Sequence, residues 1–160
     1  MPHKAVIVDH AKCNGCRICE LFCSRKHEGK VLPRASRIRI LPYFPGIEVA
    51  LVCYQCDKPP CVKICPNGAI VRDEKTKAIL IREELCTGCE ACIETCPAST
   101  IFMHPIKNIA IKCDLCSGDP ECVKRCPEGA IEYEMTPFDA RRPPEEIASD
   151  LVRKLLTHEK

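Results

Sequence analysis

Sixteen cysteines in a chain of 160 residues constrain this sequence more than any other feature. They form four groups of four, and none is left over. The first and third groups, CNGCRICELFC and CTGCEACIETC, share the spacing C-x2-C-x2-C-x3-C, whereas the second and fourth widen the middle gap to four and five residues. The positions are Cys13, Cys16, Cys19 and Cys23; Cys53, Cys56, Cys61 and Cys65; Cys86, Cys89, Cys92 and Cys96; and Cys113, Cys116, Cys122 and Cys126. One small thiol-bearing unit is therefore repeated four times.

A cysteine content this high indicates either the disulfide framework of a secreted protein or metal sites in a reducing compartment. The opening stretch MPHKAVIVDHAK has an apolar run of only Ala5 to Val8, too short for a signal peptide, and no twin arginine. No segment approaches the roughly 18 apolar residues that a membrane span needs. We therefore expect a reduced, cytoplasmic protein without a membrane span.

The compact cysteine spacing is the ligand pattern of bacterial ferredoxins, in which three cysteines hold one [4Fe-4S] cluster and the fourth ligates another. Proline follows the last cysteine in three groups, as Pro66, Pro97 and Pro127, and should end the local helix there. Zinc is the main alternative because C-x2-C pairs also form zinc sites. Zinc, however, gives no reason for the third cysteine or for the proline. Sixteen thiolates at four per cluster predict four [4Fe-4S] clusters.

The formal net charge of +2 counts every cysteine as a neutral thiol. Four clusters at about −2 each when oxidised would bring the loaded protein to roughly −6. Cations next to the ligands either moderate this charge and raise reduction potentials, or are solvated surface groups. They are Arg17, Lys63, Lys112, Lys124 and Arg125.

Short strand-like runs precede three of the cysteine groups: KAVIVD, KAILIR and NIAIK. Residues 71–80 and 36–52 each read as two strands around a turn, which predicts two β-hairpins. Each cysteine group is expected on a turn followed by a short helix. After residue 144, Ile147, Leu151 and Leu155 have helical spacing, which predicts a C-terminal helix of about four turns. This helix either packs on its own core or contacts a partner subunit.

Four cysteine groups, with no proline after the first, CDKPPC in the second and an enlarged gap in the fourth, resemble the four-cluster electron-transfer subunits of bis-pterin molybdenum and tungsten enzymes. The resemblance covers about residues 4–134. It implies an α+β fold of two pseudo-symmetric bacterial-ferredoxin-like modules with short β-hairpins and short helices, plus the C-terminal helix. The double ferredoxin-like domain would span residues 1–134, with outer motifs at 13–23 and 113–126 and inner motifs at 53–65 and 86–96. Residues 135–160 would form an extension available for partner docking.

The resemblance also implies how the cysteines share the clusters. The implied sets are Cys13, Cys16, Cys19 and Cys126; Cys23, Cys113, Cys116 and Cys122; Cys53, Cys56, Cys61 and Cys96; and Cys65, Cys86, Cys89 and Cys92. The spacing by itself does not prove this pairing.

Because every ligand position is cysteine, no iron is left open to a substrate, and we expect an electron-transfer chain without catalytic residues of its own. The implied partner is a tungsten or molybdenum pterin catalytic subunit, together with a second redox carrier. The chain looks most similar to the small subunits of tungsten aldehyde oxidoreductases or tungsten benzoyl-CoA reductase. The alternative is a free polyferredoxin that moves electrons between enzymes. Arg141 and Arg142 form too short a basic run for nucleic acid binding, and surface or packing roles are expected for His3, His10, His27, His104 and His158.

Overall fold

The computed structural model describes residues 3–44, 46–135 and 142–157, so His158 and the other residues outside these ranges are not described further. The strands and helices are β1 (Lys4–Val8), α1 (Ile18–Glu28), β2 (Arg39–Phe44), β3 (Ile47–Leu51), α2 (Pro60–Ile64), β4 (Ile70–Arg72), β5 (Ile79–Ile81), α3 (Ala91–Glu94), β6 (Phe102–Met103), β7 (Ala110–Ile111), α4 (Glu121–Arg125), β8 (Ile131–Met135) and α5 (Pro144–Thr157). Short 3-10 turns lie at Pro33–Ala35, Glu83–Leu85 and Leu115–Gly118. A small mixed protein with short hairpins, short helices and a C-terminal helix is thus confirmed.

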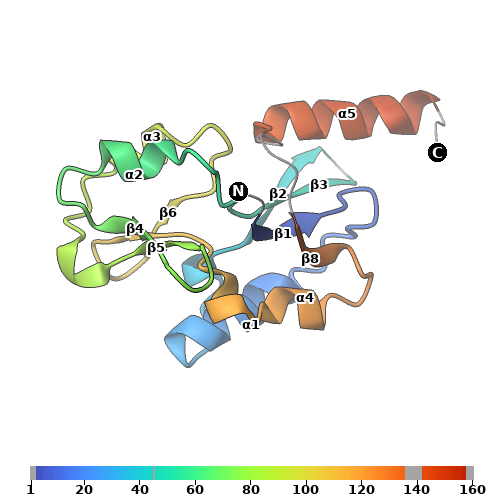
Figure 1. Cartoon of the computed structure of the whole chain (residues 1–160). Coiled ribbons are helices and arrows are strands. Elements are labelled where there is room, and N and C mark those ends of the chain that lie inside the picture. The colour runs from blue at the N-terminus through green and yellow to red at the C-terminus, as the bar shows by residue number, and fades with distance from the viewer. Residues whose placement is uncertain (1–2, 45, 136–141, 158–160) are drawn as a thin grey trace.

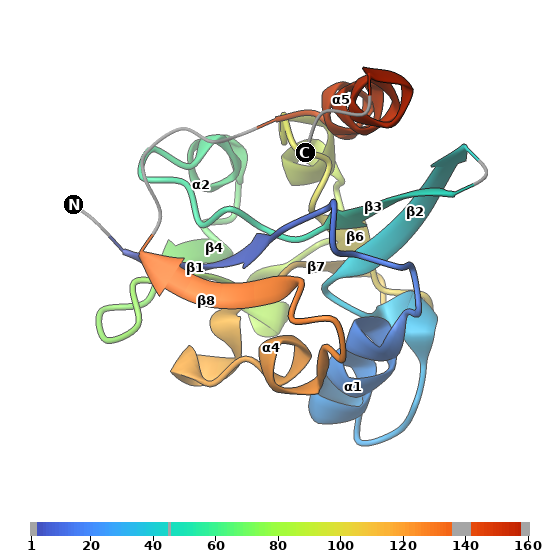
Figure 2. The same cartoon turned by 90° about the vertical axis from the view of Figure 1, so that its right-hand side faces the viewer.

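The strands pair as two-stranded antiparallel sheets. Strands β2 and β3 form one predicted hairpin, and β4 and β5 form the other. Strands β1 and β8 come from opposite ends of the cysteine-bearing region, yet Val8 lies opposite Ile131 and Lys4 opposite Met135. Figure 2 shows this ribbon beside α1 and α4. The β1–β8 pairing therefore closes the chain on itself.

Helix length follows the prolines of the cysteine groups. Helices α2, α3 and α4 have only four or five residues and end before or at a cysteine that precedes proline. Helix α1 has 11 residues, runs through Cys23 and ends at the left-handed Gly29. A proline lacks the backbone N–H that continues a helix, and the first group alone has no proline after its last cysteine. The expectation of a short helix after every group was therefore wrong for the first.

The cysteines are themselves part of the hydrophobic core. Val6, Ile38, Ile40 and Leu115 pack with buried cysteines of the first, second and fourth groups, and Ile79 packs with those of the second and third. Figure 1 shows α2, α3, β4 and β5 on one side of the molecule, and α1, α4, β1 and β8 on the other. Aliphatic side chains and cysteine sulfurs therefore share these two parts of the core.

Helix α5 packs against the protein's own β3. Ile147 and Ala148 are buried with Val49 and Leu51, and Leu151 packs beside them. At its far end, Leu155 and Leu156 are exposed. Packing on the protein's own core, the first of the two alternatives for this helix, is therefore observed along most of its length (Figure 1). None of the described helices is long and apolar enough to cross a membrane.

The contact between α5 and β3 gives a testable prediction. Ile147→Asp should lower the free energy of unfolding by about 3 kcal/mol or more, because Ile147 is only 5% exposed and the new carboxylate would lose its water. Leu156→Asp is the matched control, because Leu156 is 77% exposed, and should change it by less than about 0.5 kcal/mol. Chemical unfolding followed by circular dichroism measures both variants. Equal effects would contradict this packing.

Candidate metal centres

Four cavities within the described residues are each lined by four cysteines. Site A is lined by Cys13, Cys16, Cys19 and Cys126. Site B is lined by Cys23, Cys113, Cys116 and Cys122. Site C is lined by Cys53, Cys56, Cys61 and Cys96. Site D is lined by Cys65, Cys86, Cys89 and Cys92. Each cavity therefore gathers three cysteines of one sequence group and one cysteine of another.

Strand pairing explains why site A combines cysteines from opposite ends of the cysteine-bearing region. Val8 lies opposite Ile131 in the β1–β8 ribbon. Cys13 follows Val8 by five residues and Cys126 precedes Ile131 by five, so the two antiparallel strands lead to the same place. The side-chain amide of Asn14 donates a hydrogen bond to Glu128 at 3.0 Å across the same junction.

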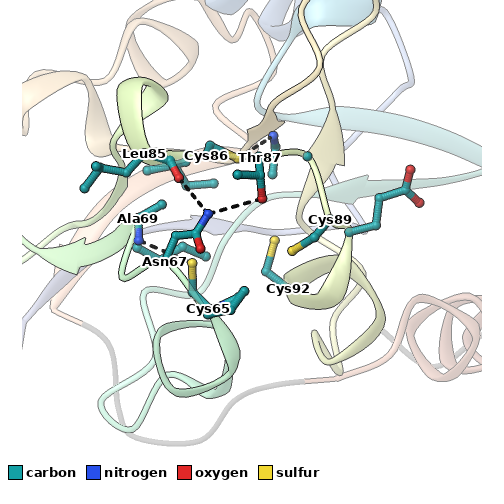
Figure 3. A pocket seen from close by; sticks show the side chains of 14 residues that line it. Cys65, Asn67, Ala69, Leu85, Cys86, Thr87, Cys89 and Cys92 are labelled. Carbon is teal, nitrogen blue, oxygen red and sulfur yellow. Dashed lines mark hydrogen bonds between the residues drawn. The ribbon is translucent and has the colours of Figure 1, made fainter.

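The same arrangement recurs at site D. Ile70 lies opposite Ile81 in the β4–β5 hairpin. Cys65 precedes Ile70 by five residues and Cys86 follows Ile81 by five. Figure 3 shows the sulfur atoms of Cys65, Cys89 and Cys92 near one another in this cavity, with Asn67 donating to Leu85 and Thr87 at its rim. The β4–β5 hairpin thus brings Cys65 close to Cys86 at site D, as the β1–β8 ribbon brings Cys126 close to Cys13 at site A.

The third cysteine of each group lies in the first turn of a helix and is buried. Burial raises the pKa of Cys19 and Cys61 to about 12 and that of Cys92 to about 11. None of the sixteen cysteines forms a disulfide. Buried, unpaired thiols that converge on one cavity fit a metal site, because a metal cation supplies the charge that stabilises their thiolates.

Backbone amides also point at the cysteine sulfurs. The N–H of Ala69 donates to Cys65 Sγ and that of Ala130 to Cys126 Sγ, both at 3.3 Å. In each case a glycine with positive φ, Gly68 or Gly129, makes the turn that brings the amide back to the sulfur. The repeated letters CPNGA and CPEGA are the sequence signature of this turn. Such N–H donors stabilise a thiolate ligand.

Gly88, inside the third cysteine group, gives a second prediction. A Cβ at this position would lie 2.6 Å from the backbone oxygen of Asn108, and φ is +70°. Gly88→Ala should lower the free energy of unfolding by about 2–4 kcal/mol, combining left-handed strain with a backbone clash. Gly68→Ala is the control, because φ is +61° but no atom lies within 4 Å of its Cβ, so only the strain of about 1 kcal/mol remains.

Thermal unfolding and iron content of the two purified variants test this prediction. Gly88→Ala should unfold at a lower temperature than Gly68→Ala and should lose iron from site D. Equal unfolding temperatures would contradict the close approach of residues 88 and 108.

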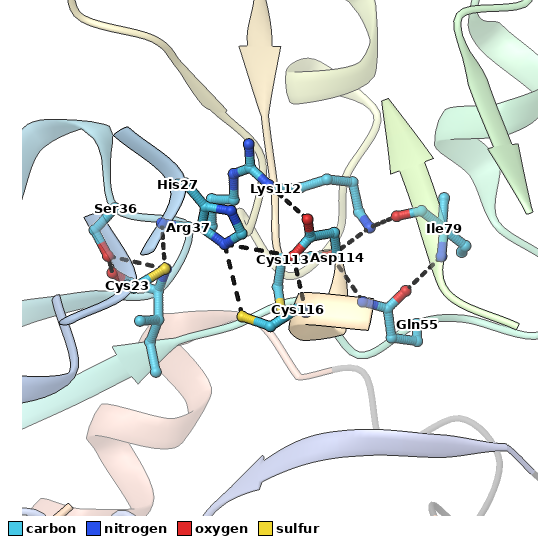
Figure 4. A network of polar contacts seen from close by, with 11 residues as sticks. Cys23, His27, Ser36, Arg37, Gln55, Ile79, Lys112, Cys113, Asp114 and Cys116 are labelled. Carbon is cyan, nitrogen blue, oxygen red and sulfur yellow. Dashed lines mark hydrogen bonds and ion pairs between the residues drawn. The ribbon is translucent and has the colours of Figure 1, made fainter. Parts of the chain in front are cut away.

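A polar network beside site B was not anticipated from the sequence. His27 Nε2 lies 3.7 Å from Cys116 Sγ and 3.5 Å from Asp114 Oδ1, and Arg37 donates to Asp114 Oδ2 at 2.7 Å (Figure 4). Burial and the charge of Arg37 lower the pKa of His27. Nothing in the sequence distinguishes His27 from the other histidines, because its neighbours in space lie far along the chain. Gln55 was also missed, although its place between Cys53 and Cys56 is a local signal.

The sixteen converging thiols and their N–H donors fit iron–sulfur clusters. The family model described as the 4Fe-4S dicluster domain matches residues 46–136, which is more than half of the chain. The chain belongs to this family. It therefore contains a ferredoxin-like domain of the iron–sulfur, [4Fe-4S] type.

Curated relatives have a similar cysteine-rich region. The polyferredoxin-like subunit of aliphatic sulfonate oxidoreductase from Pyrococcus furiosus is 49% identical over 92 residues, which are 58% of this chain and 53% of the relative. Electron transport protein HydN from Escherichia coli K12 is 34% identical over 116 residues, which are 65% of this chain and 63% of the relative. The chain thus spans between half and two thirds of the length of these relatives.

Solved structures are similar over nearly the whole chain. A chain of the active site complex BamBC of benzoyl coenzyme A reductase, as isolated, superposes with a TM-score of 0.52 at 25% identity, covering 98% of this chain and 91% of the other. The same complex with zinc gives a TM-score of 0.52 at 27% identity with the same coverage. The ferredoxin-like fold is therefore shared with a chain of an active site complex.

Proposed function

We propose that this chain is an electron-transfer subunit that holds four [4Fe-4S] clusters and relays electrons between a tungsten or molybdenum pterin catalytic subunit and another redox carrier. The observation that carries this proposal is the set of four cavities, each lined by four cysteines. When bound, such clusters accept and release single electrons. The chain would hold them in the two-module arrangement of residues 1–134.

The proposed ligands are the cysteines that line each cavity, so that sites A, B, C and D hold one cluster each. The extent of the family match supports four. Residues 46–136 contain complete cysteine sets for sites C and D, which is two clusters, as the description dicluster says. The fourth group, from Cys113 to Cys126, supplies cysteines to sites A and B, and the ligand sets of both sites are complete only with the cysteines of residues 13–23.

The chain contributes ligands, donors and shielding from water. Adjacent sites share structural elements: α1 carries Cys19 of site A and Cys23 of site B, one helical turn apart, and α4 begins beside Cys122 of site B and ends at Cys126 of site A. Because one helix carries ligands of two sites, the positions of neighbouring clusters relative to each other would be fixed. Short fixed separations and little rearrangement favour rapid electron transfer.

Similarity to a chain of the BamBC active site complex, and to a named oxidoreductase subunit, supports a catalytic partner. The sequence resemblance described above supports tungsten or molybdenum in that partner. The exposed Leu155 and Leu156 at the end of α5 form the proposed docking surface for the catalytic subunit. None of the sixteen cysteines forms a disulfide, which supports a reducing compartment, and we propose that it is the cytoplasm.

A free polyferredoxin is the second candidate. Helix α5 packs on the protein's own β3, so the C-terminal segment is not by itself evidence for a partner. HydN, one of the relatives, is named as an electron transport protein without mention of an enzyme.

Anaerobic purification of the native protein from its own cells separates the two candidates. We expect about sixteen irons per chain, a co-eluting large chain, and tungsten or molybdenum in that chain. A protein that elutes alone with full iron would favour the free polyferredoxin. A colourless protein containing zinc would reject both.

A further inference from the structure

Lys112 differs from the other cations near the cysteines because it is buried. Its exposed fraction is 3%, whereas the other four cations near the ligands are exposed. The exposed four are Arg17, Lys63, Lys124 and Arg125. Water screens exposed charges strongly, so of these five cations Lys112 is the one placed to exert a large electrostatic effect.

Two backbone oxygens of the described residues hold the ammonium of Lys112. Nζ donates to Ile79 O at 2.6 Å and to Cys113 O at 3.0 Å (Figure 4). Among the ion pairs of the described residues, none joins Lys112 to a carboxylate. A buried cation without a counter-charge is strongly unfavourable. Anionic groups in the neighbouring cavities would supply that counter-charge.

Lys112 stands at the junction of sites B and C. Its side chain lines site C, and its peptide bond joins it to Cys113 of site B. Gln55, which is fully buried, connects the same two sites: its N–H donates to Cys53 Sγ of site C at 3.4 Å, and its side-chain amide donates to Cys113 O at 2.8 Å. The oxygen of that amide accepts from Ile79 N at 2.8 Å. Ile79 and Cys113 are thereby fixed by both Gln55 and Lys112.

Lys112 is placed between the ligands of both sites, because it lines site C together with Cys61 and directly precedes Cys113 of site B. A [4Fe-4S] cluster with four thiolates gains one negative charge on reduction. A fixed cation nearby therefore stabilises the reduced state more than the oxidised one.

We propose that Lys112 is a positioning residue that raises the reduction potentials of the clusters in sites B and C together. This inference rests on the proposed function, because it takes sites B and C as cluster sites. A single buried charge would thus tune two clusters.

The test is an EPR-monitored redox titration of the purified holoprotein and three variants. In Lys112→Met, the reduction equilibrium constants of two clusters should fall about tenfold each, which is 59 mV for a one-electron couple. Lys112→Arg keeps the charge and should retain wild-type potentials. Lys63→Met is the matched control, because Lys63 lies in the second cysteine group but is exposed, and it should shift each equilibrium constant less than about twofold.

Iron counts accompany every titration and separate the possible outcomes. Wild-type protein with fewer than four clusters would reject the proposed function before any variant is compared. With wild type fully loaded, the tuning role is overturned if Lys112→Met keeps its iron and shifts fewer than two clusters, or if Lys112→Arg shifts as far as Lys112→Met. It is also overturned, in favour of a structural role, if Lys112→Met loses iron that Lys112→Arg keeps.

Discussion

Cys126→Ser is expected to disrupt one cluster, the one held by cysteines of the N-terminal group more than a hundred residues earlier. Cys126 lines site A with Cys13, Cys16 and Cys19, whereas its sequence neighbours Cys113, Cys116 and Cys122 line site B. Serine is a poor replacement for a thiolate on iron. Iron and acid-labile sulfide should fall by about a quarter, from about sixteen to about twelve per chain.

Double variants identify which cluster is lost. Cys126→Ser combined with Cys16→Ser alters the same site twice, so iron should fall no further than in the single variant. Cys126→Ser combined with Cys116→Ser alters two sites, and about half of the iron should be lost. If instead the pair with Cys116 matched the single variant and the pair with Cys16 lost half, the crossed arrangement of ligands would be refuted.

Removal of iron and sulfide is expected to unfold residues 3–44 and 46–135 rather than leave them folded without clusters. Cysteines from distant segments belong to both core clusters, and because none of them forms a disulfide, only bound iron and sulfide would link the four thiols of each cavity. In addition, Arg17 and Glu90 hold left-handed backbone in the cysteine turns, with φ of 60° and 62°, which costs about 1–2 kcal/mol each. Metal binding has to offset these costs, so folding and cluster binding are coupled.

Thermal scans that record visible absorbance and far-ultraviolet circular dichroism together measure this coupling. In the loaded protein, cluster bleaching and loss of secondary structure should occur at the same temperature. After anaerobic chelation the cooperative transition should disappear, while a mock-treated sample keeps it. An iron-free protein that still unfolds cooperatively at the original temperature would show that the hydrocarbon core suffices.

Local structure was largely predictable from the sequence. The two hairpins form where alternating apolar runs flank turn residues, and α5 forms where apolar residues recur at helical spacing. The prolines after Cys65, Cys96 and Cys126 end short helices because a proline cannot donate the next helical hydrogen bond. The length of α1 was not predicted, although the missing proline after Cys23 was visible.

Packing decided the features that local patterns do not encode. Five cations near ligands looked equivalent in the sequence, and only the fold buries Lys112 between two sites while leaving Lys63 in water. His27 meets Cys116 and Asp114 because α1 packs beside the segment that leads to α4. The sequence likewise predicts the apolar face of α5 but not the surface that covers it, which in the folded protein is β3.

The sequence by itself determined the chemistry of this protein: the number of thiols, their spacing and the turns that present them, because these depend on residues close together in the chain. The tertiary structure alone decided which thiols share a cavity. Cys126 joins Cys13 because Val8 pairs with Ile131, and that strand pairing is a contact between distant segments, stabilised by burial that no short stretch can provide alone.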